Sequence, residues 1–127
     1  MNEKTESKLL EHLECAAASL KSIALLRAVD AFYTREEYME LLCQYRALLA
    51  NDLAAYGEVQ RVREADPDRG IGWEERIEKY GEEEANKRNA PFNAAFDAKK
   101  ATSDKVRDFE RVNPLIVSLH RLNPSAM

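Results

Sequence analysis

Residues 31–38, Ala-Phe-Tyr-Thr-Arg-Glu-Glu-Tyr, decide how the first half of the chain folds. Thr34 has the hydroxyl of a helix N-cap, and Glu37 follows it by three positions, which is the spacing of a capping box. Apolar residues recur at helical spacing on both sides of this stretch. We therefore expect it to divide a long helical pattern into two helices, 6–33 and 35–64, that fold back on each other as an antiparallel hairpin.

The first of these helices is apolar along one side and becomes apolar all round near its end. From Leu25 to Tyr33 the apolar side chains point to most sides, and such a helix must be covered on more than one side. We expect the apolar segment 114–122 to pack there. The stripe along the earlier part consists of Leu9, Leu13, Ala16, Leu20, Ile23 and Ala24, widened by Leu10 and Ala17.

The rest of the chain also reads as helical, because it holds only four Gly and four Pro among its 127 residues. An all-β fold would need more turn residues. Pro91 suits the first turn of a helix. The prediction is therefore all-α, with a loop at 66–72 and further helices at 73–89, 91–112 and 114–122.

Helices of about 26 residues approach 40 Å in length, whereas a compact globule of this chain length would have a diameter near 36 Å. We therefore expect an elongated helical bundle of four to five helices, with residues 1–127 in a single domain. The N-terminal residues lack the basic start of a signal peptide, and charges interrupt the longest apolar stretch. These features predict a soluble, cytoplasmic chain with no membrane span.

The net charge of −4 conceals an uneven distribution. Residues 34–85 carry a net charge of −7 and residues 86–127 a net charge of +4. These charges are either two solvated surfaces of opposite sign or the complementary surfaces of a dimer. In the second interpretation one side carries Lys99, Lys100, Lys105, Arg107 and Arg111, and the other carries Glu74, Glu75, Glu78, Glu82, Glu83 and Glu84.

Trp73 is the only tryptophan and follows the Gly-containing loop directly. Tryptophan is enriched among the residues that dominate interfaces, so Trp73 is a candidate anchor for a partner. Its large ring equally suits the closing of a helical core. Both interpretations stay open on the sequence alone.

No constellation of residues carries recognisable catalytic or metal chemistry. His12 and Cys15 share a helix side, but two His and two Cys in the whole chain fall short of a structural zinc site. Neither His has the Glu-x-x-His spacing of carboxylate-bridged di-iron bundles. The chain lacks a helix-turn-helix signature and is acidic overall, which argues against nucleic acid as a partner. We expect no cofactor and two free thiols.

The sequence thus favours a non-enzymatic helical protein that mediates protein–protein interaction or regulation, through self-association or a protein partner. Whether it is an enzyme is not decided by any motif, although the absence of catalytic motifs argues against it. The alternative is a small helical ligand-binding protein or enzyme with a polar pocket between its helices. Arg27, Arg46 and Asp52 would line that pocket, with arginine holding an anionic group.

Overall fold

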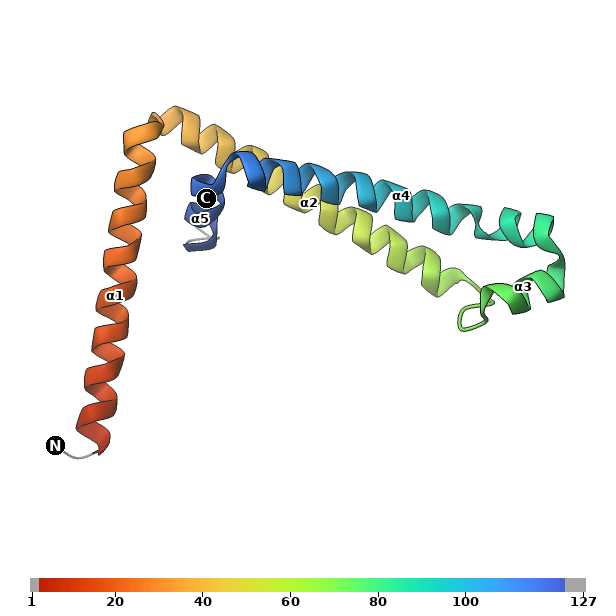
Figure 1. Ribbon diagram of the computed structural model, residues 1–127, viewed down its shortest axis with the longest axis horizontal. Helices are drawn as coiled ribbons and strands as arrows, with labels where there is room; N and C mark the ends of the chain where they lie inside the picture. Colours follow the sequence, from red (N-terminus) through yellow and green to blue (C-terminus); the bar gives the residue numbers. More distant parts are fainter. Residues whose placement is uncertain (1–2, 123–127) are drawn as a thin grey trace. The chain divides into compact units, whose positions relative to one another are not determined.

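The computed structural model describes residues 3–122, and these residues are all-α with no strand among them. Contacts divide the chain into two compact units: unit 1 comprises Met1–Gln44 with Val112–Met127, and unit 2 comprises Tyr45–Arg111. The helices, labelled in Figure 1, are α1 (Glu3–Phe32), α2 (Arg35–Ala65), α3 (Trp73–Tyr80), α4 (Glu82–Val112) and α5 (Pro114–Leu122).

The break between α1 and α2 lies where the sequence predicts it. The backbone N–H of Glu37 donates a hydrogen bond of 3.2 Å to the Thr34 hydroxyl, and the N–H of Tyr38 donates to the Thr34 carbonyl at 3.1 Å. Thr34 is therefore the N-cap of α2. The antiparallel pairing of 6–33 with 35–64, the single domain and the elongated shape stay predictions.

The core of unit 1 forms where α5 packs against the end of α1. Val29 of α1 and Ile116 of α5 are both 0% exposed, and Val117 of α5 is buried beside them. Leu42, near the start of α2, is the other buried apolar residue of this unit among those described. The prediction that segment 114–122 packs on the apolar end of the first helix is thus confirmed at Val29, while Leu26 and Phe32 of that end stay 46% and 75% exposed.

In unit 2, α2 and α4 lie side by side and run antiparallel (Figure 1). From here on, the hairpin is this pair of helices, α2 and α4, and not the predicted pairing of 6–33 with 35–64. The rings of Tyr45 and Phe109 stack with their centroids 5.2 Å apart, and Thr102 donates a hydrogen bond of 2.8 Å to Asp52. Toward the other end of the hairpin, the guanidinium of Arg63 on α2 lies 5.6 Å from the ring centroid of Phe92 on α4. These contacts keep one register along the whole hairpin.

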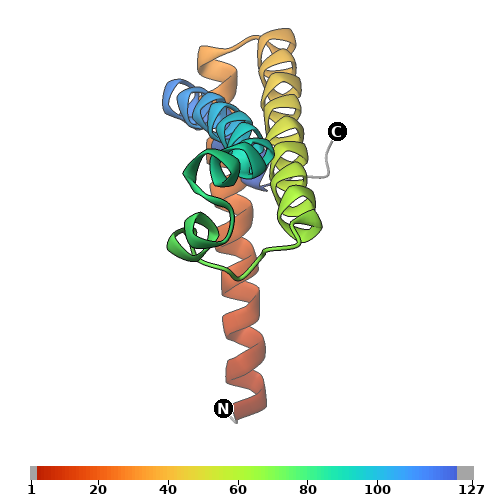
Figure 2. The ribbon, with the colours of Figure 1, turned by 90° about the vertical axis from the view of Figure 1, so that its right-hand side faces the viewer.

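Buried and half-buried residues of both helices form series with the alternating three- and four-residue spacing of a coiled coil. Figure 2 views this hairpin from the end at which the loop and α3 connect its two helices. On α2 the spacing runs through Tyr45, Leu48, Asp52, Ala55, Val59 and Val62. On α4 it runs through Phe92, Ala95, Lys99, Thr102, Val106 and Phe109.

Asp52 is a carboxylate in the middle of this otherwise mostly apolar contact. Ser103 and Thr102 donate hydrogen bonds of 2.7 and 2.8 Å to it, and the Lys99 ammonium lies 4.0 Å away. The hydrogen bonds from Ser103 and Thr102 lower the pKa of Asp52. A shifted register would separate the carboxylate from these hydroxyls, so this polar layer favours the observed alignment.

The predicted boundary between helices 73–89 and 91–112 was wrong. The chain breaks at Gly81 instead, where φ is 83° and the backbone N–H donates to the Ile77 carbonyl at 2.7 Å. Glycine tolerates this left-handed conformation, which ends α3 after only eight residues. Pro91 lies inside α4 rather than at its start. The loop at 66–72 is as predicted.

Candidate functional site

The first part of α1 is an amphipathic helix whose apolar side is exposed. Every residue from Glu3 to Lys21 is exposed. The five large apolar side chains of this region, counting Ile23, are between 49 and 67% exposed. We define the α1 seam as the residues with strict four- and three-residue spacing: Leu9, Leu13, Ala16, Leu20 and Ile23.

The α1 seam lies on a different side of the helix from the surface that α5 covers. Val29, which is buried in the unit 1 core, is nine residues from Leu20. At 3.6 residues per turn this interval is two and a half turns, which places the two side chains on opposite sides of α1. Packing of α5 therefore leaves the seam open.

The positions that border the seam carry no charge. Glu11, Glu14 and Lys21 fall outside these bordering positions in the heptad spacing, pointing away from the seam. A helix laid along the seam would therefore meet no unpaired charge. The bordering residues between 10 and 26 are Leu10, His12, Ala17, Ser19, Ala24 and Leu26.

Three of the charged residues predicted to form a dimer surface contact other side chains of the same chain. Lys99 donates to the Ser103 hydroxyl at 2.9 Å and lies 4.0 Å from the Asp52 carboxylate of α2. Glu84 pairs with Arg88 at 3.1 Å, and Arg107 pairs with Asp104 at 2.9 Å. Lys100, Glu82 and Glu83 are exposed. Their role in self-association stays a prediction.

The remaining predicted residues are spread over both units. Trp73 is the first residue of α3 and is 42% exposed. Arg27 is exposed on α1 in unit 1. In unit 2, Arg46 is half-buried on α2. One carboxylate oxygen of Asp52, Oδ1, accepts hydrogen bonds from the hydroxyls of Thr102 and Ser103 on α4. Ligand binding by these three residues stays a prediction.

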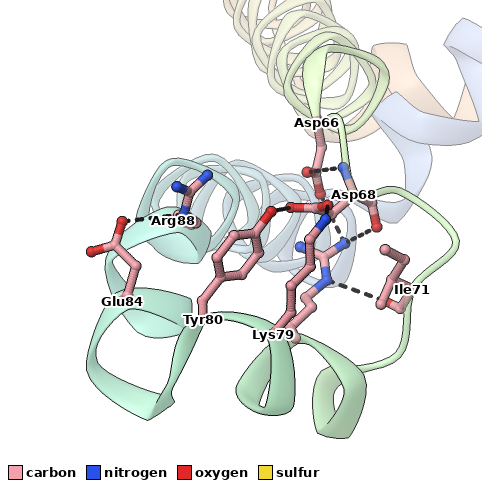
Figure 3. Close-up of polar contacts among 8 residues, drawn as sticks. Asp66, Asp68, Ile71, Lys79, Tyr80, Glu84 and Arg88 are labelled. Atoms are coloured by element: carbon pink, nitrogen blue, oxygen red, sulfur yellow. Dashed lines mark hydrogen bonds and ion pairs between the residues drawn. The ribbon is translucent and has the colours of Figure 1, made fainter.

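Sequence reasoning missed a polar cluster that fixes the loop of unit 2 (Figure 3). Asp68 is only 6% exposed, and its carboxylate accepts hydrogen bonds from Tyr80 at 2.6 Å and Lys79 at 2.9 Å. Asp66 accepts one from the N–H of Asp68, which is an Asx turn. The Asp-Pro-Asp sequence at 66–68 was the available signal for that turn.

Arg76 of α3 completes this cluster from the other side. Its guanidinium donates to the Asp66 carboxylate at 2.9 Å, to the Asp68 carbonyl at 2.8 Å and to the Ile71 carbonyl at 3.1 Å. One side chain thus satisfies three acceptors of the loop. Because the loop is tied to α3 in this way, the end of the hairpin has a defined shape.

The Asp68 cluster should make unit 2 sensitive to acid. Hydrogen bonds from Tyr80 and Lys79 lower the pKa of Asp68. Its ionised form therefore contributes stability above the unfolded-state pKa, about 4. This contribution is lost as the pH falls through the lower folded-state pKa. We expect Asp68→Asn to lower the melting temperature at pH 7 and to flatten its decline below about pH 4.

Thermal melts monitored by circular dichroism from neutral to acid pH test this expectation. Asp97→Asn, at an exposed position on α4, is the matched control and should keep the wild-type pH profile. An unchanged acid limb in Asp68→Asn would show that the cluster does not link protonation to folding.

Within residues 3–122, no group of three or more His, Cys, Asp or Glu side chains is placed to hold a metal ion. Cys15 and Cys43 are exposed thiols. None of the helices in the described part of the chain is long and apolar enough to cross a membrane.

No protein-family model matches this chain, and no curated protein or solved structure is significantly similar to it.

Proposed function

We propose that this chain is an interaction protein that associates with a second copy of itself through the α1 seam. The supporting observation is a helix of about five turns whose apolar residues repeat as in a coiled coil and are exposed. Such a helix is marginal in water by itself, since most helical stability in proteins comes from packing of the apolar side. A partner helix supplies that packing.

A second copy of α1 fits the seam best in the antiparallel orientation. When Leu13 of one copy lies opposite Ile23 of the other, Ala16 falls opposite Leu20. In the two layers nearest the symmetry axis, the small Ala16 of one copy therefore packs against the large Leu20 of the other, which favours close approach of the helices. Small side chains also surround the symmetry axis of this arrangement, because residues 17–19 are Ala-Ala-Ser.

The charge at the end of the seam also favours the antiparallel orientation. Arg27 occupies the next seam position after Ile23. In a parallel pair the two Arg27 side chains would face each other, and two like charges at a core position are destabilising. In the antiparallel pair Arg27 lies opposite Leu9 of the other copy, where its aliphatic stem covers the leucine and its charge reaches water.

The size of the seam indicates a reversible dimer. At about 25 cal/mol per Å², burial of a Leu or Ile side chain, worth about 1.5–3 kcal/mol, corresponds to roughly 60–120 Å². The four Leu and Ile side chains of the seam from each copy therefore remove about 480–960 Å² from water. Stable interfaces begin at about 1,200 Å². We expect dissociation in the micromolar range, observable by sedimentation equilibrium.

Disulfide trapping tests the orientation directly. In a background with Cys15→Ser and Cys43→Ser, Ala17→Cys places the new thiol of one chain across the symmetry axis from the same thiol of the second chain. We expect mild oxidation to convert this variant into a covalent dimer. Ala18→Cys, one position along the helix and directed away from the seam, is the matched control and should stay mostly uncrosslinked. Equal crosslinking of the two variants, or a monomer at every concentration, would refute the proposal.

A further inference from the structure

A cavity of about 750 Å³ opens at the end of the unit 2 hairpin, where α2 passes into the loop. This volume lies within the range of small-molecule sites. No residue of α1 lines the cavity, so it bears on a property that the proposed dimer does not use. Its walls come from the last turn of α2, residues 66–70, Arg76 of α3 and the 88–92 segment of α4.

The walls of this cavity concentrate positive charge in an acidic part of the chain. Residues 34–85 contain seven basic and fourteen acidic residues, yet four of those seven basic residues line the cavity. One more arginine on α4 brings the lining to five arginines. The same lining contains three carboxylates, those of Glu64, Asp66 and Asp68. The C-terminal end of α2 adds about half a negative charge. Among the lining side chains alone the positive charge is in surplus, and Glu58 and Glu84, which lie outside the lining, pair with two of the arginines. The five are Arg61, Arg63, Arg69, Arg76 and Arg88.

Several of these arginines already have acidic partners. Arg76 pairs with Asp66, Arg61 with Glu58, and Arg88 with Glu84. Among residues 3–122, Arg63 and Arg69 take part in no ion pair. Their guanidinium groups are therefore the donors with capacity for an additional anion.

The carboxylates of the loop do not compete for these two arginines. Asp66 is held by Arg76, and Asp68 is held by Lys79 and Tyr80. These bonds also fix the loop that carries Arg69, so the wall is formed before any ligand arrives. A preformed site loses less conformational entropy on binding.

One wall of the cavity is apolar and carries an arginine over an aromatic ring. Phe92 and Pro91 of α4 line it together with Val62 of α2. The Arg63 guanidinium lies 5.6 Å from the centre of the Phe92 ring. This combination suits a ligand with a flat apolar body and an anionic group, since arginine binds phosphate and stacks on rings.

We propose that this cavity binds a small organic phosphate, with Arg63 and Arg69 as the phosphate-binding residues and Phe92 contacting the organic body. Phenyl phosphate is a suitable probe, and inorganic phosphate and phenol separate its two parts. At constant ionic strength, phenyl phosphate should raise the melting temperature more than either part alone. Isothermal titration should give a millimolar or lower dissociation constant.

The double variant Arg63→Gln/Arg69→Gln is expected to weaken phenyl phosphate binding by at least about tenfold, since hydrogen bonds to charged groups are lost. The matched control Lys105→Gln/Arg111→Gln removes the same charge from exposed α4 positions outside the cavity and should bind as the wild type does. Circular dichroism without ligand checks that both variants are folded. Equal affinity in the two variants, or equal stabilisation by sodium sulfate, would overturn the proposal.

Discussion

Replacing Ile116 with Ala is expected to lower the free energy of unfolding of unit 1 by about 2–5 kcal/mol. Ile116 is 0% exposed and lies on α5, the helix that packs against α1, in which Val29 is also 0% exposed. Truncation removes buried methyl and methylene groups and leaves a cavity, and both effects favour unfolding. Total stabilities of small domains are only about 5–15 kcal/mol, so the change is large.

Amide hydrogen exchange measures this loss for each unit. Exchange at the end of α1 and in α5 should accelerate in Ile116→Ala, while the α2–α4 contact around Val59 keeps its protection. Leu122→Ala, on the same helix but 45% exposed, is the control and should change stability by less than about 1 kcal/mol. Similar protection in Ile116→Ala and the wild type would contradict the account of the unit 1 core.

Leu13→Glu together with Leu20→Glu is expected to abolish self-association at micromolar concentration. Each substitution places a carboxylate in the middle of the α1 seam, where the proposed dimer excludes water. Both copies carry the change, so four charges must be desolvated or the dimer must dissociate. We expect the dissociation constant to rise by at least about 100-fold, which corresponds to about 2.7 kcal/mol.

The matched control adds the same charge on the far side of the helix. Ser7→Glu and Ala18→Glu both lie outside the seam, so this double variant should associate as the wild type does. Sedimentation equilibrium of the three proteins provides the comparison. If the control dissociates equally, net charge rather than the seam controls association, and the proposed contact is wrong.

The parts of the fold that were predictable depend on local chemistry. Thr34 forms the predicted N-cap because its hydroxyl is three residues from the N–H that it accepts. The docking of segment 114–122 was also predictable, since the all-round apolar end of the first helix requires a cover. Both arguments need only the spacing of residues along one helix.

The errors concern choices between locally similar alternatives. Gly81 and Pro91 are both residues that end helices, and the chain breaks at the glycine because it accepts a positive φ. The contact of α2 with α4 was not predicted from the apolar stripe of α2. Tyr45 and Asp52 contact Phe109 and Thr102 far along the chain, and such register is fixed by side chains on two helices at once.

The interior of unit 1 has a consequence for the order of events during synthesis. Val29 emerges from the ribosome before unit 2 is made, whereas Ile116 and Val117 follow unit 2 along the chain. Unit 2 consists of one uninterrupted segment and can fold first. Until α5 is made, the apolar surface of α1 that α5 covers stays exposed to solvent. A truncated or stalled nascent chain would therefore expose Val29, and we expect such chains to aggregate or to be captured by chaperones.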